Sequence, residues 1–212
     1  MVFFLRLDNK CIYDIIYPQG NLMIIYITGK SGSGKSTFSK RLAKLLNYKY
    51  IDVDEVGHKV YEFPEIMEKA YQLFGTDINN EFGKFDRKKL GQIVFNERHS
   101  ARVKAFSDLT WEYMKKNLDK EIQDCAIVDW ILLPHTKYWR KNAVKILIKP
   151  QDENLRLAKI IARDNITEEY AKLRDKASIE YNENEFDFVF ENDYNEENLQ
   201  KNISAVIEHL RR

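Results

Sequence analysis

The sequence predicts an α/β protein in which a parallel sheet carries helices on both faces. Short apolar runs alternate along the chain with amphipathic stretches of helical periodicity, a pattern typical of parallel sheets. The alternation continues without an internal repeat or a Pro/Gly/Ser-rich linker. The length of 212 residues fits one domain, since domains usually span about 100 to 200 residues.

The expected elements follow one another in a regular order. Apolar runs predict strands over 22–28, 48–54, 125–129, 144–148 and 188–190. Helical periodicity marks 38–46, 55–60, 65–74, 88–120, 153–163, 168–181 and 196–211. Ligands of such a sheet bind at the carboxyl ends of its strands, so the residues that follow each strand are candidates for a functional site.

A phosphate-binding loop follows the first expected strand. The segment Gly29-Lys30-Ser31-Gly32-Ser33-Gly34-Lys35-Ser36 fits G-x-x-x-x-G-K-[ST] between a strand and a helix. Its glycines let backbone N–H groups curl around phosphate oxygens, and the helix N-terminus favours negative charge. We therefore expect residues 29 to Thr37 to bind ATP, with Lys35 on the β- and γ-phosphates and Ser36 on Mg²⁺.

Composition narrows the class of protein. The net charge of +1 gives no global argument for nucleic acid or a membrane surface as partner. No run approaches the ~20 apolar residues of a membrane span, and charged residues interrupt the N-terminus where a signal peptide needs an apolar core. Cys11 and Cys125 lack metal-ligand spacing and suggest reduced thiols. We expect a cytoplasmic protein, either a monomer or a weak homo-oligomer.

Residues 1–22 are not expected to belong to the domain. Residues 1–22 lie upstream of the motif, and Met23 stands one residue before the first strand's apolar core. We expect either that Met23 is the natural start or that 1–22 form an appendage outside the domain. The remainder, 23–212, is expected to be a single domain.

Two carboxylates follow the second expected strand. If that strand runs to Asp54, then Asp52 and Asp54 are alternate residues on one face and point together toward the phosphates and the metal. A carboxylate there suits phosphoryl transfer, which needs a base near the acceptor hydroxyl. The alternative is that one of them caps the helix expected over 55–60.

With these residues in view, the chain resembles the dephospho-CoA kinase family from about residue 24 to about residue 207. The resemblance rests on blocks whose order and spacing are more specific than the phosphate loop. They are Ile27-Thr28-Gly29 through Thr37, Ile51-Asp52-Val53-Asp54 followed by His58, Phe85-Asp86-Arg87-Lys88-Lys89-Leu90 with Ile93-Val94-Phe95, Leu157 to Arg163-Asp164-Asn165-Ile166-Thr167, and Phe188 to Glu191-Asn192-Asp193.

The resemblance implies transfer of the γ-phosphate of ATP to the ribose 3′-hydroxyl of dephospho-CoA, with Mg²⁺. It implies Asp54 as the base, Arg163 as a lid arginine over the phosphates and Asn192 near the adenine. His58 and Arg87, with Asp52, match positions on the acceptor side. It also implies a P-loop kinase fold with a core over 23–60 and 122–212, a helical substrate-binding region over about 61–121 and a lid over about 153–181.

The chain departs from the family pattern at four places. Trp111-Glu112 replaces a usual His-Pro, and the segment from Asp129 to His135 replaces Pro-Leu-Leu-Phe-Glu. We expect Asp129 to supply the lost carboxylate on the substrate side, the alternative being a capping or turn aspartate. Lys159 stands where a lid arginine is usual, and Tyr194 where a glycine is usual.

Simpler interpretations exist for several residues. Arg163 and Asp164 could be a solvated pair at a helix end, and His58 a surface histidine. Arg87 could serve its own helix start through Asp86, and Asn192-Asp193 could be a plain turn. Two other functions are alternatives: a related P-loop kinase of a nucleoside, nucleotide or other small alcohol, and a catalytically weak nucleotide-binding regulator.

Overall fold

The computed structural model describes residues 23–211 except 98, 134–142 and 177–178. The described chain divides into two compact units. The first comprises the residues up to Asp52 together with those from Ile122 onward, and the second is Val53–Glu121. Each unit is described by itself.

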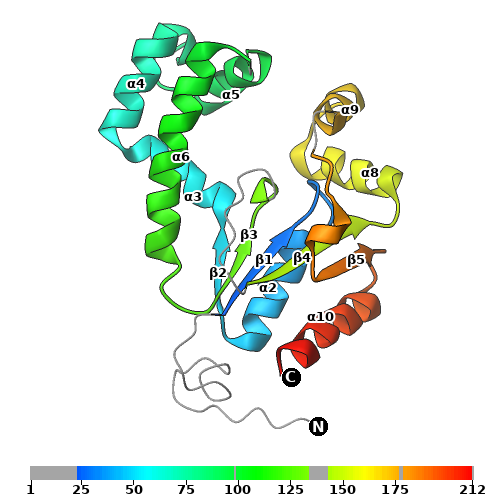
Figure 1. Ribbon diagram of the computed structural model, residues 1–212. Helices are drawn as coiled ribbons and strands as arrows, with labels where there is room; N and C mark the ends of the chain where they lie inside the picture. Colours follow the sequence, from blue (N-terminus) through cyan, green and yellow to red (C-terminus); the bar gives the residue numbers. More distant parts are fainter. Residues whose placement is uncertain (1–22, 98, 134–142, 177–178, 212) are drawn as a thin grey trace. The chain divides into compact units, whose positions relative to one another are not determined.

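The first unit is built on a five-stranded sheet in the order β2-β3-β1-β4-β5 (Figure 1). All neighbouring strands pair in parallel. The strands are β1 Ile24–Thr28, β2 Lys49–Asp52, β3 Ala126–Asp129, β4 Val144–Pro150 and β5 Phe188–Asn192. The chain leaves β1 for the edge strand β2 and returns through β3, which places the end of β1 where a ligand crevice is expected in such sheets.

One face of the sheet packs against two helices, α2 Lys35–Leu46 and α10 Glu196–Leu210 (Figure 1). Alternate strand residues such as Ile25 and Ile27 point to this face and bury their side chains with those of Phe38, Leu42 and Val206. The amphipathic pattern of both helices explains their position, since their apolar stripes supply the other half of the core. This packing holds the start of α2 at the carboxyl end of β1.

Two further helices of this unit follow β4: α8 Glu153–Asp164 and α9 Glu168–Lys176. Asp152 caps α8, because its side chain accepts hydrogen bonds from the N–H groups of Asn154 and Leu155. Asn165 ends α8 in the left-handed conformation, a common helix stop. The two helices correspond to the segment that the resemblance describes as a lid.

The second unit is helical. Its helices are α3 Val53–Lys59, α4 Pro64–Phe74, α5 Arg87–Asn96 and α6 Ala101–Glu121. Their core contains Ile66, Ala70, Phe74, Ile78, Leu90, Val103 and Phe106. The stretch expected as one helical run over 88–120 is two helices, because a turn closed by the N–H of Ser100 on the carbonyl of Glu97 separates them.

The prediction that the second strand continues to Asp54 is wrong. β2 pairs with β3 from Lys49↔Ala126 to Asp52↔Asp129, and both strands end at that last pair. Without a neighbour to continue the ladder, the chain turns into α3 at Val53, where Asp54 and Glu55 suit the positive helix N-terminus. Asp52 and Asp54 therefore do not share a strand face.

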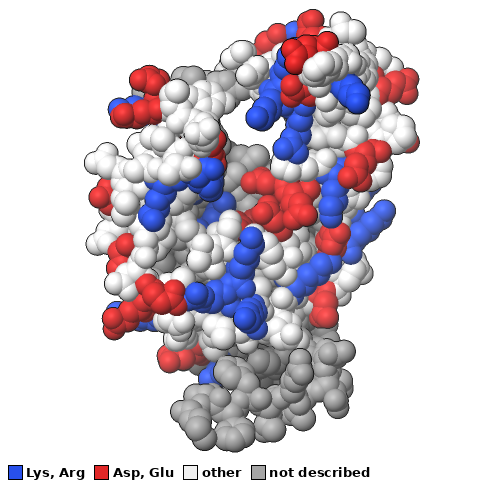
Figure 2. Space-filling model, turned by 180° about the vertical axis from the view of Figure 1, so that it is seen from behind, with Lys and Arg blue, Asp and Glu red and all other residues white. Residues whose placement is uncertain are grey.

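The surface carries charges of both signs. Figure 2 shows acidic and basic side chains interspersed over the face that it presents, in keeping with the net charge of +1. Within the described residues, no helix combines the length and the apolar character needed to cross a membrane.

Candidate active site

The predicted phosphate loop lies between β1 and α2. Gly34 occupies the position before the first helical residue with φ of 92°, which favours glycine. A Cβ at Gly34 would lie 2.1 Å from Nδ2 of Asn192, so the close approach of that side chain also requires glycine. The loop therefore presents Lys35 and Ser36 in the first turn of α2, where phosphate binds best.

A buried carboxylate faces these two residues. Asp129 ends β3 with only 2% of its surface exposed, and its Oδ1 lies 3.6 Å from Nζ of Lys35. Burial raises the pKa of Asp129, while the Lys35 ammonium and hydrogen bonds from Ser36 and Tyr50 oppose the shift. Within the described residues Oδ1 accepts no hydrogen bond. A buried oxygen in that condition is costly unless a ligand satisfies it.

Tyr50 joins the two acidic strand ends. Its hydroxyl lies 3.1 Å from Oδ2 of Asp129 and 3.5 Å from Oδ2 of Asp52. Burial, together with the two carboxylates, raises the pKa of Tyr50, so the hydroxyl keeps its proton and remains a donor. Tyr50 was not among the predicted site residues, although its spacing of two from Asp52 on a strand is the signal that the two share a face.

The residues around Asp129 fit Mg²⁺. This cation prefers hard oxygen ligands and is usually held by one or two protein groups, with water and substrate phosphates completing the shell. The Ser36 hydroxyl and Oδ1 of Asp129 supply such oxygens at the phosphate loop. No group of three or more His, Cys, Asp or Glu among the described residues could hold a metal alone.

Arg163, which the resemblance assigns to a lid, reaches the phosphate loop. Its Nη2 donates to Oγ of Ser31 at 3.3 Å, and its Nε donates to Asp164 at 2.7 Å. The hydrogen bond to Asp164 raises the pKa of Arg163, so the guanidinium keeps its charge. The pair with Asp164 and the contact with the loop exist together, and the first does not exclude the second.

A cavity of about 240 Å³ adjoins the loop. Its walls include Gly34, Phe38, Lys159, Phe190, Asn192 and Tyr194. The Asn192 side chain is engaged within the protein: Nδ2 donates to the carbonyl of Ser33 at 2.8 Å, and Oδ1 accepts from the N–H of Tyr194 at 2.9 Å. Residues 192–194 thus form a turn, and the side-chain amide of Asn192 supports the phosphate loop through its hydrogen bond to Ser33.

Comparisons with known proteins agree with these features. The model of the dephospho-CoA kinase family matches residues 23–198. A protein named dephospho-CoA kinase from Fusobacterium nucleatum is 32% identical over 193 residues, covering 90% of this chain and 100% of the relative. This chain belongs to the dephospho-CoA kinase family. The sequence-based identification of the family is confirmed.

Solved structures confirm the fold class. The crystal structure of TT1252 from Thermus thermophilus has a TM-score of 0.74 at 25% identity and covers 90% of this chain and 98% of that one. The dephospho-CoA kinase from Campylobacter jejuni has a TM-score of 0.61 at 24% identity, covering 89% and 96%. The predicted α/β P-loop fold with a parallel sheet is therefore correct.

The residues that the dephospho-CoA kinase family implies for the acceptor side lie mostly in the second unit. Asp54 is in the first turn of α3, His58 is in the last turn, and Arg87 begins α5. All three are exposed. Asp86 caps α5 by accepting from the N–H groups of Lys88 and Lys89, so the helix start has a cap of its own.

Asp52 and Asp129 belong to the first unit. Asp129 was predicted on the acceptor side, but its contacts with Lys35, Ser36 and Tyr50 lie on the phosphate side. Of the other departures from the dephospho-CoA kinase pattern, Trp111-Glu112 falls within α6, whereas Pro134 and His135 fall outside the described residues.

Proposed function

We propose that the protein transfers the γ-phosphate of ATP to the ribose 3′-hydroxyl of dephospho-CoA, giving coenzyme A and ADP. The observation that carries the proposal is the phosphate loop with Lys35 facing the buried Asp129, in a chain that matches the dephospho-CoA kinase family over residues 23–198. A phosphate loop alone serves many reactions, and the family match selects this one.

On the donor side, the protein's task is to place and neutralise charge. Phosphoryl transfer spreads negative charge over the equatorial phosphate oxygens. We assign Lys35 and Arg163 to those oxygens, because Lys35 begins α2 and Arg163 contacts the loop at Ser31. Ser36 and Asp129 would hold Mg²⁺, which neutralises charge on the phosphates when bound. Tyr50 orients the Asp129 carboxylate through its hydrogen bond.

On the acceptor side, we assign Asp54 as the general base. The ribose 3′-oxygen forms a bond to the γ-phosphorus as the bond to the β-phosphate oxygen breaks, and Asp54 accepts the hydroxyl proton. The support is the family block that contains Asp54 and the exposed position of its carboxylate in α3. We assign Asp52, His58 and Arg87 to acceptor binding on the same family ground.

An acceptor panel tests the proposal. The purified protein is incubated with Mg-ATP and dephospho-CoA, pantetheine phosphate, nucleosides or gluconate, and ADP release is followed. The expected result is turnover with dephospho-CoA and a product phosphorylated at the 3′-position. Turnover with another acceptor only would contradict the proposal in favour of a related kinase. Silence with every acceptor would favour a nucleotide-binding regulator.

Three finer statements belong to the same proposal. We expect turnover to require Mg²⁺, which titration of the metal against a chelator measures. We expect a monomer or weak homo-oligomer, which sedimentation at several protein concentrations measures. A cytoplasmic location is expected from the reaction proposed, and cell fractionation checks it.

A further inference from the structure

We propose that Arg156, Asn192 and Tyr194 act as positioning residues for the triphosphate. Together they form a carbonyl brace, in which each side chain holds one of three consecutive peptide carbonyls of the phosphate loop. Holding the carbonyls on the outside of the loop fixes the direction of the N–H groups that receive phosphate. The proposal concerns ATP binding and does not depend on which alcohol accepts the phosphate.

The brace consists of three hydrogen bonds. Nη1 of Arg156 donates to the carbonyl of Ser31 at 2.9 Å. The Tyr194 hydroxyl donates to the carbonyl of Gly32 at 3.0 Å, and Nδ2 of Asn192 donates to that of Ser33 at 2.8 Å. The donors come from two segments, α8 and the turn after β5, and lie between 125 and 162 residues from their acceptors in sequence.

The geometry of the peptide unit converts these bonds into control of the N–H groups. In a planar trans peptide, the C=O of one residue and the N–H of the next point in opposite directions. Bracing the carbonyls of Ser31 and Ser33 therefore turns the N–H groups of Gly32 and Gly34 the opposite way. Bracing that of Gly32 turns the N–H of Ser33 toward the carbonyl of Lys30, to which it donates at 3.1 Å.

The glycines of the loop explain why such bonds would matter for binding. Gly32 has φ of 77° and Gly34 φ of 92°, and glycine moves among backbone conformations more freely than any other residue. A loop of this composition loses entropy when it closes around phosphate. External bonds to its carbonyls place part of that ordering in the free protein, which is preorganisation for the ligand.

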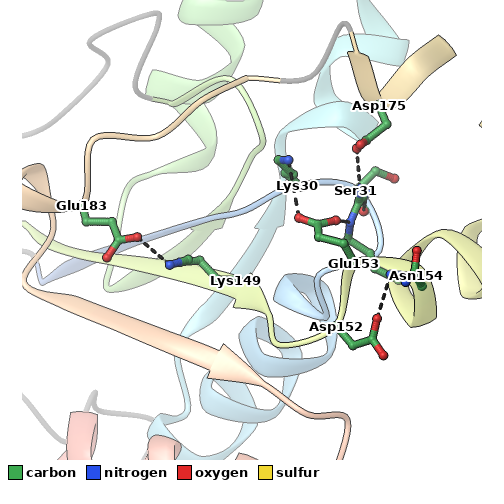
Figure 3. Close-up of polar contacts among 9 residues, drawn as sticks. Lys30, Ser31, Lys149, Asp152, Glu153, Asn154, Asp175 and Glu183 are labelled. Carbon is green, nitrogen blue, oxygen red and sulfur yellow. Dashed lines mark hydrogen bonds and ion pairs between the residues drawn. The ribbon is translucent and has the colours of Figure 1, made fainter. Parts of the chain in front are cut away.

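Arg156 is buried and is held in place by two acidic partners. Only 1% of its surface is exposed, and it donates to Glu153 of its own helix and to Asp175 of α9. Glu153 in turn lies 3.5 Å from Lys30 of the loop, so the buried guanidinium belongs to a charge-balanced network. Figure 3 shows Lys30, Ser31, Glu153 and Asp175 close to one another.

The stem of Arg156 also packs closely on the loop. A Cβ at Gly32 would lie 3.2 Å from Cγ of Arg156 and 2.7 Å from Cγ1 of Ile160. Helix α8 therefore contacts the loop through both apolar and polar parts of its side chains.

Tyr194 holds an unusual conformation to make its bond. Its φ is 62°, in the left-handed region, which is unfavourable for a residue other than glycine or asparagine. Oδ1 of Asn192 secures it by accepting the Tyr194 N–H, and the ammonium of Lys159 lies 4.6 Å from the ring centre. Burial raises the pKa of Tyr194, so its hydroxyl remains a donor.

The test separates the phosphates from the base. Binding of ATP and of inorganic tripolyphosphate is measured by calorimetry for the wild type, Tyr194→Phe and Asn192→Ala. Tyr194→Phe loses one neutral hydrogen bond, and Asn192→Ala loses two, its own to Ser33 and the one that secures Tyr194. In each variant both ligands should bind about 3- to 10-fold more weakly, by the same factor for ATP and tripolyphosphate. Arg156→Lys keeps the charge but loses the fork, and should weaken both at least as much. Lys149→Met, which removes a partly exposed pair with Glu183 and no hydrogen bond to the phosphate loop, is the control.

A second readout reports on the loop itself. In ¹⁵N spectra of the ligand-free protein, the amide signals of Gly32, Ser33 and Gly34 should move in Tyr194→Phe and Asn192→Ala but not in Lys149→Met. Weaker ATP binding with unchanged tripolyphosphate binding would overturn the brace and make Tyr194 a base contact. Unchanged binding of both ligands, or unmoved loop signals, would also overturn it. Inactivity toward dephospho-CoA would leave tripolyphosphate binding intact and so speaks only to the proposed reaction.

Discussion

The donor and acceptor sides of this protein differ in how their polar side chains are held. The proposed donor residues Lys35, Ser36, Asp129 and Arg163 lie within one unit, and each has a partner there. The proposed acceptor residues Asp54, His58 and Arg87 lie on exposed helix ends of the other unit. Apart from Arg163, whose side chain is exposed, the proposed donor groups are buried or half-buried in the free protein, whereas the proposed acceptor groups are exposed.

This difference indicates how each side uses the free energy of substrate binding. A preorganised phosphate site loses little conformational entropy when it binds ATP. Its fixed charges stabilise the charge that develops in the transition state. Exposed acceptor groups interact only weakly with other charges while water surrounds them. Substrate binding removes that water, and the electrostatic interactions of these groups then become stronger. Substitutions on the two sides should consequently have different kinetic signatures.

The largest effect is expected from Lys35→Ala. Loss of the ammonium at the β- and γ-phosphates should lower kcat/KM by about 10³-fold, because phosphoryl transfer is accelerated mainly by positioning and by stabilising charge on the phosphates. ADP release in a coupled assay measures it. Lys44→Ala, an exposed change near the end of the same helix, is the matched control. A loss below tenfold would remove Lys35 from the donor side.

Asp54→Asn tests the acceptor side. Loss of the base should lower kcat by ~10²-fold or more, while the Kd for ATP stays nearly unchanged. Steady-state kinetics and calorimetry separate the two quantities, and Glu55→Gln in the same helical turn is the control. If ATP affinity falls and turnover at saturation stays normal, Asp54 is a binding residue and the contrast between the two sides fails.

Asp129→Asn sharpens the assignment of this residue to the donor side. It should raise the Mg²⁺ concentration for half-maximal activity by about tenfold and leave the KM for dephospho-CoA little changed.

The same variant tests the pH dependence of stability. Because burial raises the pKa of Asp129 in the folded state, the wild type should lose stability relative to the variant as the pH rises from about 4. Activity against Mg²⁺ and thermal melts from pH 4 to 7 measure both effects. A selective rise in the acceptor KM would return Asp129 to the acceptor side.

The smallest effect concerns Tyr181, whose hydroxyl donates to the carbonyl of Ile131 at 3.1 Å. Burial raises the pKa of Tyr181 from 10.0 to about 12. The unfolded chain releases this proton first, so the stability contribution is full below pH 10 and is lost between pH 10 and about 12. Tyr181→Phe should reduce this slope by roughly 1.4 kcal/mol per pH unit at most. Denaturant unfolding across this range measures it, with the exposed Tyr170→Phe as control. Equal slopes would show that the first unit does not hold Tyr181 as described.

Much of the fold was predictable because its signals are local. The phosphate loop, the apolar strands and the amphipathic helices each lie within a few residues of chain. The end of β2 was mispredicted, because the alternation Asp52-Val53-Asp54 looks like a strand, while the partner strand β3 stops at Asp129. The break between α5 and α6 could not be predicted either. Glycine and proline are the usual signals of a helix end, and neither occurs between 92 and 120.

The parts of the site that were missed depend on contacts between distant residues. Tyr50 acquires its role only when β2 and β3 pair, which brings it to a carboxylate 79 positions away. The engagement of Asn192 with the loop backbone depends on β5 lying at the end of the sheet order. A single sequence shows which residue types are present, but not which of their hydrogen bonds the tertiary structure has already used.

The position of β5 has a consequence for how the protein is made. Asn192 and Tyr194 follow the loop carbonyls that they hold by 159 and 162 residues. They stand at the end of β5 and in the turn after it, and β5 pairs with β4. During synthesis, these two bonds can form only after β5 and the turn that follows it have been made, whereas Arg156 of α8 is available earlier, so the proposed brace is completed in two stages.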